Sequence, residues 1–377
     1  MKIAQARAEI RGLSNIQWLH KDLMDIPSLG LGKFDFIECW GVLTHLPEPL
    51  EGLKILQNSL TNAGGMSLML YSKYARTGVY QMQELMRLVN KFAKTMPEEI
   101  ENTRKILKIL PKTNWYKRSE LDQLEAYGEY RYGSRSHDIS KAYSDTEIYD
   151  IFLTKIDTPY SIPEIYQLVE NASMNFIDYS AWDTRIALQV GNYVKDEELL
   201  NMILKKTKIK QEAIAELIIG YLSRYEFYIS NNKEAEASFD DLENVPYMYG
   251  NTKKLERRLE ECWNFSEKED YIFEENIRST LFKEGSRIKM KLKWPMNKYA
   301  KMFLEEVMKN ENKSIGEILA VATKSFNQSK DILLEEFKRI YSAAKLSGLM
   351  LLRHKNVPEF RMTQNHVLYE LYREKEE

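Results

Sequence analysis

The chain has 377 residues, of which 44% are hydrophobic, so it is long enough for two or three domains that each bury a core. Its 54 basic and 56 acidic side chains nearly cancel, and no chain-wide field would attract nucleic acid or an anionic membrane. The longest apolar runs, at 217–221 and 349–352, fall far short of the roughly 20 residues that a membrane span needs.

The first residues and the cysteines bear on compartment and metal content. The opening run MKIAQARAEIRG has no apolar core or cleavage signature, which argues against secretion and predicts a cytoplasmic protein. Cys39 and Cys262 lie far apart, and the five histidines are scattered. We therefore expect neither a disulfide framework nor a metal site.

The first elements alternate between helix and strand. Residues 1–12 have helix-forming composition and end at Gly12, a typical C-cap. Two strands are expected next, over 15–22 and 34–41. The second, FDFIECWG, is a nearly continuous apolar run, typical of a parallel strand covered on both faces. The sheet should therefore belong to an α/β fold.

A crossover unit follows the second strand. Pro47 and Pro49 precede a helix with apolar residues at helical spacing, and the pair Gly64-Gly65 is expected to end it. MSLMLYS, at 66–72, then predicts a third strand. Strand, helix and strand joined by short connections form the right-handed crossover of a parallel sheet. The helix positions that carry this pattern are Leu50, Leu53, Leu56 and Leu60.

The middle of the chain is predicted to be mostly helical. No strand is expected between 78 and 132, and two capping boxes, beginning at Ser144 and Ser161, each open a periodic apolar segment. The acidic run at 231–244 indicates a linker. Between these points we expect helices at 145–155 and 162–171, a strand at 174–182, a long helix marked by Ile214, Leu217, Ile218, Tyr221 and Leu222, and a strand at 225–230.

Beyond the linker, RIKMKLKW at 287–294 alternates basic and apolar residues, as in a strand with one basic face. Gly348 ends the last expected helix, and LMLL follows as a strand. This C-terminal set resembles a winged-helix module. Its helices are expected near 252–263, from Asn297, at 314–321, and around Ile332, Leu333, Phe337, Ile340 and Ala344.

Two segments together carry a resemblance to a known family. GLSNIQWLHKDLMDIP and FDFIECWGVLTHLPEPLEGLKILQNSLTNAGGMSLMLYS resemble the middle of class I S-adenosylmethionine-dependent methyltransferases. Asp22 stands where the family has the acidic residue that closes its third strand. The run from Phe34 to His45 resembles the fourth strand and the loop after it, and Asn62-Ala63 replaces the Lys-Pro usual before the glycine pair.

The resemblance implies S-adenosylmethionine as cofactor and a set of residues around it. Asp22 and Leu23, at the carboxyl end of a strand, would present acceptor and donor groups to an adenine ring, although Asp22 could instead only cap a turn. Cys39, Trp40 and Gly41 end the next strand, where a glycine lets the backbone approach the sulfonium closely. Trp40 could equally serve packing alone.

Candidates for the methyl acceptor's side of the site lie after the third strand. Tyr71, Ser72 and Arg76 are plausible substrate-facing groups, against the alternative of ordinary strand-end polarity. His45 is a weak candidate for a general base, because in the resembling proteins this position mainly stabilises a loop. Many methyl transfers need only an aligned nucleophile near an activated methyl group, so the lack of a clear acid/base pair does not argue against the class.

The family's first two strands and its glycine-rich turn have no counterpart in the sequence. Gly30 and Gly32 precede a strand and lack a third glycine, so they do not form that turn. The family's strand order, 3-2-1-4-5-7-6, would leave a gap of roughly 14 Å between its third and fourth strands. Either the third strand docks against the fourth, or an exposed parallel edge awaits a partner.

We therefore expect an α/β, partial Rossmann-like sheet that lacks its first two strands, followed by a mostly helical C-terminal region. The expected divisions are a truncated methyltransferase core at 1–75, a helical insertion at 76–160, the end of the core with a helical extension at 161–230, and a helical, winged-helix-like domain at 245–377.

Two functions remain open. The first is a methyltransferase that is inactive alone and binds its cofactor only with a separately encoded N-terminal fragment, acting on a protein side chain or a small molecule. The second is a non-catalytic regulatory or binding protein that acts through its C-terminal domain. There the basic strand could contact nucleic acid, although such alternation is usually a solvated face. The residues in question are Arg287, Lys289, Lys291, Lys293 and Trp294.

Overall fold

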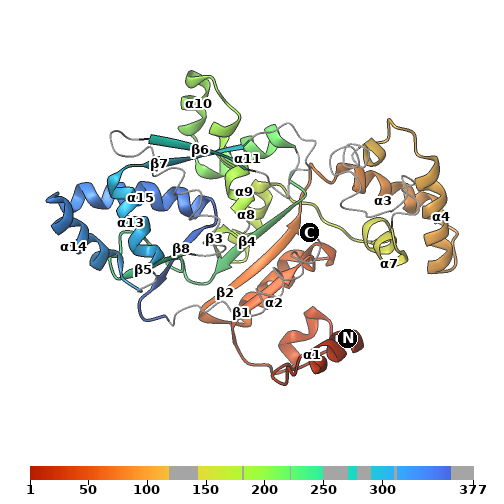
Figure 1. Cartoon of the computed structure of the whole chain (residues 1–377). Coiled ribbons are helices and arrows are strands. Elements are labelled where there is room, and N and C mark those ends of the chain that lie inside the picture. Colours follow the sequence, from red (N-terminus) through yellow and green to blue (C-terminus); the bar gives the residue numbers. More distant parts are fainter. Residues whose placement is uncertain are drawn as a thin grey trace. The chain divides into compact units, whose positions relative to one another are not determined.

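The computed structural model in Figure 1 describes residues 1–118, 143–180, 182–220, 222–248, 271–277, 290–309 and 312–357. Its described residues form two compact units, one built on Met1–Ala235 and the other on residues from Glu236 onward. None of the described helices is long and apolar enough to cross a membrane. Cys262 lies outside the described residues.

Unit 1 begins with a helix and an arm that lacks regular structure. Helix α1 (Lys2–Ile10) confirms the first predicted helix. Residues 13–22, here called the arm, contain no strand, so the strand predicted at 15–22 is wrong. Every side chain of the arm is exposed, and no strand among the described residues pairs with the arm's backbone. A 3₁₀ helix, η1 (Leu23–Ser28), leads from the arm to the sheet.

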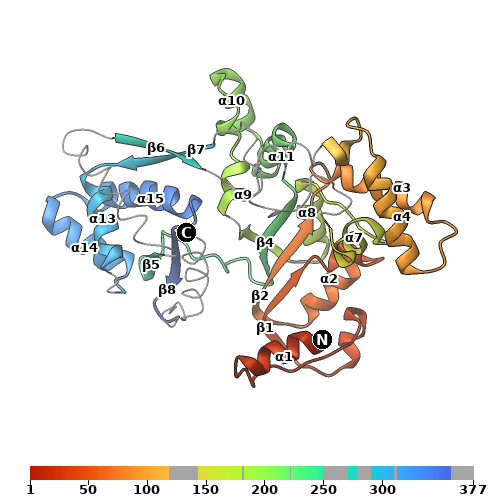
Figure 2. The same ribbon diagram turned by 45° about the vertical axis from the view of Figure 1, so that its right-hand side comes forward.

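The sheet of unit 1 has four strands in the order β1-β2-β4-β3. Strands β1 (Phe34–Trp40) and β2 (Leu60–Tyr71) pair in parallel, and helix α2 (Pro49–Asn58) connects them (Figure 2). Strand β4 (Arg224–Ser230) pairs antiparallel with β2 and with β3 (Asn175–Tyr179). The predicted crossover unit is confirmed, and β1 is an edge strand.

The crossover differs from its prediction at the glycine pair. Helix α2 ends at Asn58, and β2 begins at Leu60, so Gly64 and Gly65 lie inside the strand instead of ending the helix. A Cβ atom on Gly64 would lie 3.1 Å from the carbonyl oxygens of Phe34 and Thr61. The pair therefore permits a close backbone approach, which is a second common role of glycine in strands.

The two faces of β1 differ in how far the rest of the protein buries their side chains. Cys39 is buried, whereas Phe34, Phe36 and Trp40, on the opposite face, are exposed. The prediction that β1 is covered on both faces is therefore wrong for this face. Strand β2 is buried in the middle of the sheet. The core there is built from Leu53, Leu56, Met66, Leu68, Leu70, Tyr225, Phe227 and Ile229.

A lobe of helices follows β2 and has a core of its own. It contains α3 (Thr77–Val89), α4 (Met96–Ile109) and α7 (Asp145–Ile148), and α7 continues into the π-helix η4 (Tyr149–Leu153). No strand occurs at 78–118, as expected, while 119–132 lie outside the described residues. The buried residues of the lobe core are Met82, Met86, Ile100, Leu107, Tyr116, Ile148 and Phe152.

Short helices complete unit 1. Both capping boxes, at Ser144 and Ser161, are present as predicted, and the second opens α8 (Ile162–Asn171). After β3 come α9 (Trp182–Ala187), η5 (Val190–Asn192), α10 (Glu197–Leu204) and α11 (Lys208–Ile219). Helix α11 ends earlier than predicted, because Gly220 adopts φ +61° and forms a left-handed C-cap.

The described residues of unit 2 form two pairs of strands and three helices. Strand β5 (Asn244–Met248) pairs antiparallel with β8 (Met350–His354), and β6 (Tyr271–Ile277) pairs with β7 (Met290–Met296). Three helices, α13 (Lys298–Met308), α14 (Ile315–Phe326) and α15 (Lys330–Leu346), bury Phe303, Phe337 and Ile340. The predicted final strand is confirmed, and the helix expected near 252–263 lies outside the described residues.

Candidate functional site

The carboxyl ends of β1 and β2 lie at the same edge of the sheet, because the two strands run in parallel. In open α/β sheets, ligands bind at this edge. Gly41 follows β1 with φ +65°, and its N–H donates to the Met69 carbonyl at 3.1 Å. A Cβ atom on Gly41 would lie 3.2 Å from Cε of Met69 and 3.8 Å from the Tyr71 hydroxyl. Glycine therefore keeps this corner open.

The two residues before Gly41 differ in exposure. The Trp40 side chain is half-exposed, and its Nε1 donates to Oγ of Ser67 at 2.9 Å. Cys39 is buried, and desolvation raises the pKa of its thiol to about 11. The Cys39 thiol is therefore protonated at neutral pH and is a poor nucleophile.

Asp22 and Leu23 lie elsewhere than the sequence indicated. Since the arm contains no strand, Asp22 is the N-cap of η1, and its carboxylate accepts from the Met24 N–H at 2.9 Å. Leu23 contacts α2, where a Cβ atom on Gly52 would lie 3.6 Å from Leu23 Cδ2. The capping role that the sequence left open for Asp22 is the one observed.

Arg76 contacts Tyr71, another of the predicted substrate-facing residues. Its guanidinium carbon lies 3.8 Å from the centre of the Tyr71 ring, and its Nη2 donates to Oδ2 of Asp157 at 3.1 Å. Gln83 donates to the same carboxylate oxygen at 3.0 Å. The Asp157 side chain is only 1% exposed, so this ion pair is shielded from water. Tyr71 is thereby fixed against a cation at the end of β2.

Ser72 is buried and holds the turn after β2 through hydrogen bonds. It is fully buried, and its Oγ accepts from the Ala75 N–H at 3.3 Å, while its carbonyl accepts from the Tyr80 hydroxyl at 3.0 Å. Desolvation raises the pKa of Tyr80 to about 12, so that hydroxyl keeps its proton and remains a donor. Ser72 therefore shapes the turn after β2 and presents no free hydroxyl at the surface.

Residues 156–160, which follow the helical lobe in the chain, lie across the carboxyl ends of β1 and β2. The Thr158 N–H donates to the Thr44 carbonyl at 2.8 Å, and the Tyr160 N–H donates to the Tyr71 carbonyl at 3.0 Å. Nδ1 of His45 lies 2.8 Å from the Ile156 carbonyl. Because a carbonyl only accepts, Nδ1 carries the proton in this contact. His45 therefore anchors residues 156–160, here called the crossing segment, and its catalytic role stays a prediction.

Several buried polar atoms around the crossing segment have no hydrogen-bond partner among the described residues. They include Thr44 Oγ1, Arg76 Nε and Asp157 Oδ1. Unpartnered buried groups are rare in native proteins and commonly mark a water or ligand position. Their concentration beside Tyr71 and His45 makes this strand-end region the best candidate site in unit 1.

Sequence reasoning missed three members of this site: Tyr80, Gln83 and Asp157. Asp157 lies 81 positions from Arg76, and nothing in the spacing of either residue indicates their pairing. Tyr80 and Gln83 lie on α3 and fit an ordinary helix pattern. Their roles in the site depend on the path that the chain takes from the helical lobe back to the sheet. The residues next to Tyr80 and Gln83 in the sequence do not indicate this path.

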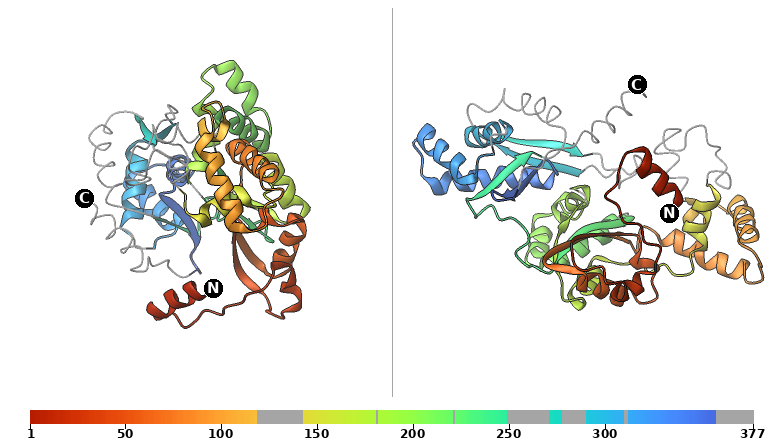
Figure 3. Two further views of the ribbon diagram at one scale, coloured as in Figure 1. Left: turned by 90° about the vertical axis from the view of Figure 1, so that its right-hand side faces the viewer. Right: turned by 90° about the horizontal axis from the view of Figure 1, so that it is seen from below.

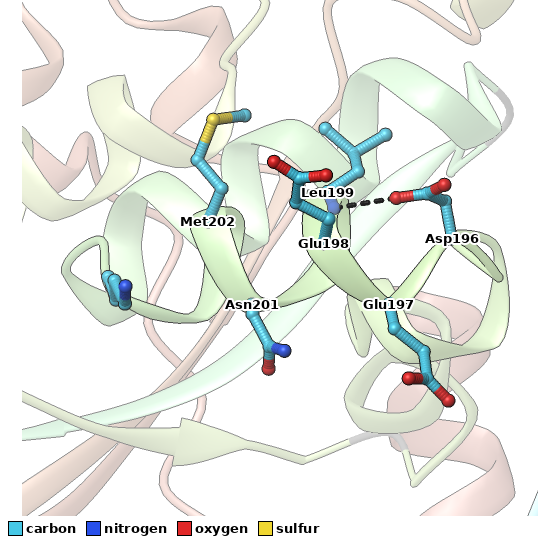
Figure 4. A pocket seen from close by; sticks show the side chains of 7 residues that line it. Asp196, Glu197, Glu198, Leu199, Asn201 and Met202 are labelled. Atoms are coloured by element: carbon cyan, nitrogen blue, oxygen red, sulfur yellow. Dashed lines mark hydrogen bonds between the residues drawn. The ribbon is translucent and has the colours of Figure 1, made fainter.

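Two hollows on the surface lie away from the strand ends. One, of about 760 Å³, lies along α10, where Figure 4 shows the Leu199 N–H bonded to Asp196. A second, of about 430 Å³, lies between α1 and the arm. Neither hollow is lined by a residue that the sequence predicted for the site. Within the described ranges, no cluster of three His, Cys, Asp or Glu could hold a metal ion.

Comparisons with known proteins bear on the fold. No family model matches the chain. Two solved structures of PKMT2 from Rickettsia typhi, one in complex with AdoHcy, match with a TM-score of 0.50 at 13% identity, over 93% of this chain and 64% of that one. The chain has the same fold. The predicted α/β fold is confirmed in this coarse form.

Curated proteins also match the chain by sequence. One of these relatives is the uncharacterized protein syc1184_c of a Synechococcus species, which is 22% identical over 243 residues. The match takes in 64% of this chain and 54% of the relative. The chain thus spans about half the length of this relative and less than two thirds of PKMT2.

Proposed function

We propose that unit 1 binds S-adenosylmethionine at the carboxyl ends of β1 and β2 and takes part in methyl transfer from it. The observation that carries the proposal is the open corner at Gly41, between two parallel strand ends and beside Tyr71. PKMT2, which shares the fold, was solved in complex with AdoHcy, the product that S-adenosylmethionine leaves after losing its methyl group. The family resemblance of the same two strands points to the same cofactor.

The residues present fit one wall of such a pocket. A side chain at position 41 would fill the corner, and the half-exposed Trp40 ring offers a flat apolar surface beside it. We propose Cys39, Trp40 and Gly41 as the cofactor's contacts, with Asp22 and Leu23 joining them if the arm moves toward β1. S-adenosylmethionine supplies an electrophilic methyl group on a sulfonium. The protein's contribution is to align the acceptor with that methyl group.

Tyr71 and Arg76 are proposed to border the acceptor, on the side of the site away from β1. The Arg76 guanidinium lies over the Tyr71 ring, and the ion pair with Asp157 holds it there. Ser72 supports the turn that carries both residues. His45 would act by fixing the crossing segment over the site.

We also propose that strong cofactor binding needs a separately encoded N-terminal fragment, and that the protein acts in the cytoplasm. The support for the fragment is that β1 is the last strand of its sheet in the described residues, so the cofactor's other wall is open. Localisation is checked by fractionating source cells and probing the soluble fraction for the chain.

The test is calorimetric titration of the full chain with S-adenosylmethionine and AdoHcy, using ATP as the unrelated adenosine ligand. We expect weak but selective binding of the first two, and loss of that binding in Gly41→Ala, whose Cβ would be strained at φ +65°. Phe92→Ala, at an exposed loop position, is the matched control. Equal heats for all three ligands would contradict cofactor binding, and tight binding by the lone chain would contradict the need for a fragment.

The second candidate is a non-catalytic regulatory or binding role for unit 2, with a winged-helix-like module at 245–377. Its support is that α13, α14 and α15 enclose a core separate from unit 1. Trp294 is only 3% exposed, which removes it as a stacking residue for nucleic acid. Arg287 and Lys289 lie outside the described residues. Lack of retention on DNA or RNA at low salt would remove the nucleic-acid version of this role.

A further inference from the structure

The chain enters and leaves the helical lobe at one place on the sheet of unit 1. It leaves the end of β2 at Ser72, forms the lobe, and returns along the crossing segment, whose Tyr160 makes a parallel bridge with Ser72. The Lys73 N–H also donates to the Tyr160 carbonyl at 2.9 Å. The right-hand view of Figure 3 shows the lobe, coloured orange to yellow, beside the sheet. Two adjacent connections can act as a hinge, because only a few residues need to change their backbone angles for the lobe to rotate.

Buried hydrogen bonds join the crossing segment to the lobe. Gln83 of α3 is 3% exposed and donates both to Oδ2 of Asp157 and to the Ile151 carbonyl, each at 3.0 Å. Arg76, at the N-cap of α3, donates to the same carboxylate oxygen at 3.1 Å. Ile151 belongs to the π-helix η4, a rare form of helix that is frequent at functional sites. The crossing segment and the lobe should therefore move as one body.

On its other side, the crossing segment meets the 3₁₀ helix η2 (Leu43–His45), which follows β1. The Thr158 N–H donates to the Thr44 carbonyl at 2.8 Å. Nδ1 of His45 donates to the Ile156 carbonyl, also at 2.8 Å. Such a hydrogen bond contributes little net stability, because water takes the partner's place when the bond breaks. These two closing contacts can therefore open while the sheet stays folded.

Polar atoms without partners lie around the crossing segment. In the part of the chain that the structure describes, Thr44 Oγ1, Asp157 Oδ1 and Arg76 Nε are buried and make no hydrogen bond. A buried polar atom without a partner costs the full loss of its hydration. Lifting the segment would return water to these atoms, which lowers the free-energy cost of opening. A ligand enclosed beneath the segment would instead supply the missing partners.

We propose that the lobe and the crossing segment form a lid, which turns about the Ser72–Tyr160 connection and lifts from η2 to admit a ligand to the carboxyl ends of β1 and β2. The structure shows the lid closed, since Thr44 and Ser72, which follow the two strands, are fully buried. The edge at which open α/β sheets bind ligands is thus covered. The identity of the ligand rests on the proposed function. The inference deepens that function by giving His45 a positioning role, because His45 holds the lid shut over the bound ligand.

Hydrogen exchange of the full 377-residue chain, without ligand, tests the opening. After correction for intrinsic exchange rates, we expect residues 156–160 to exchange at least tenfold faster than β4, which lies inside the sheet. The reason is that a lid opens locally, whereas β4 exchanges only when the sheet unfolds. Exchange of residues 156–160 at the rate of β4 would overturn the proposal, since the segment would then be a fixed part of the sheet.

Variants of His45 test the closing contacts. His45→Ala removes a donor, and we expect exchange of residues 156–160 to rise about two- to tenfold while β4 is unchanged. His45→Asn keeps an N–H donor near the position of Nδ1 and should restore the wild-type rate. His20→Ala, at an exposed position of the arm, is the matched control. Equal rates in His45→Ala and the wild type would overturn the lid as proposed, and thermal melting checks that each variant folds.

AdoHcy tests what the lid covers. With AdoHcy at about ten times the dissociation constant from the titration, we expect exchange of residues 156–160 to slow about tenfold, because the ligand must leave before the lid lifts. Bound AdoHcy that leaves this exchange unchanged would overturn the proposal while cofactor binding stands. Opening of the lid in a chain that gives no heat with AdoHcy would support the lid and contradict the proposed function. The two failures are thus separable.

Discussion

Asp157 is the side chain on which the placement of Arg76 depends. The two form an ion pair with side chains 1% and 16% exposed, and Gln83 supplies a further hydrogen bond to the carboxylate. Removing one partner of a buried pair leaves the other charge without compensation, which is more costly than losing the attraction itself. Asp157 should therefore matter for stability as well as for the site.

We expect Asp157→Ala to lower the free energy of unfolding by about 3–5 kcal/mol, as measured by urea denaturation. The matched control is Glu84→Ala, which breaks an exposed pair with Arg87 and should cost less than about 1 kcal/mol. The double variant Arg76→Met, Asp157→Leu should recover much of the loss, because neither charge is then buried alone. Equal effects of Asp157→Ala and Glu84→Ala would show that the pair is not shielded.

Glu212 is a buried carboxyl that should make stability depend on pH. Desolvation raises its pKa above the ordinary value of 4.5, although the Tyr166 and Tyr179 hydroxyls both donate to it at 3.0 Å. Between the unfolded and folded pKa values the folded protein holds a proton that the unfolded chain releases. The contribution of Glu212 to stability is therefore greatest below the unfolded value and falls as pH rises through this window.

Glu212→Gln removes that dependence. We expect the stability of the variant relative to the wild type to improve as pH rises from about 4 toward 8, as measured by urea denaturation at each pH. Glu198→Gln, at an exposed position on α10, should show no such trend. A difference between Glu212→Gln and wild type that stays constant with pH would contradict a raised pKa at this site.

Gly78, near the start of helix α3, lies too close to a neighbouring backbone to carry a side chain. A Cβ atom on Gly78 would lie 2.6 Å from the Tyr116 nitrogen and 2.8 Å from its Cα. These are backbone atoms, which cannot rotate away as a side chain can. Replacing a helical glycine by alanine usually stabilises a helix by about 0.5–1 kcal/mol, so a loss here would identify the contact.

We expect Gly78→Ala to destabilise the helical lobe and to speed hydrogen exchange in α3 and around Tyr116. Gly191→Ala is the control, because nothing lies within 4 Å of its added Cβ. The relevant comparison is the midpoint of thermal unfolding for the two variants, with exchange locating the change. Stabilisation by Gly78→Ala would mean that the lobe shifts at little cost.

The elements predicted correctly are those whose sequence pattern lies within their own residues. Ser144 and Ser161 each begin a capping box, and the strand expected at 225–230 is present as β4. The strand expected at 15–22 failed because a strand needs neighbours that its own residues cannot specify. Gly64 was misplaced because glycine serves helix ends and close strand contacts alike.

The candidate site was predicted in part for the same reason. Gly41 follows β1 and Tyr71 is the last residue of the parallel neighbour β2, so their proximity could be inferred from order along the chain. The pairing of Arg76 with Asp157 could not, because the helical lobe intervenes. Whether the predicted cofactor and substrate residues act in those roles stays a prediction that the titrations above address.

The two units differ in how their cores are built. Unit 1 packs helices on a four-stranded mixed sheet, with Phe227 fully buried on β4. Unit 2 encloses Phe337 among helices, where its ring stacks on Phe303 at 4.8 Å between centroids. Phe239, early in unit 2, stacks on Tyr341 of the same unit, so the chain after Glu236 belongs to the second core. Because the cores are separate, we expect a substitution in one core to destabilise only the unit that contains it.

We expect Phe337→Ala to cost about 3–5 kcal/mol in unit 2, through lost burial and the cavity left behind, without loosening unit 1. Hydrogen exchange should accelerate in α13–α15 while β2 and β4 keep their protection, and Phe227→Ala should give the reverse pattern. The two variants control for each other, since both remove a fully buried phenylalanine ring. Loss of protection throughout the chain in either variant would show that the units unfold as one, because only a shared cooperative transition transmits the damage from one core to the other.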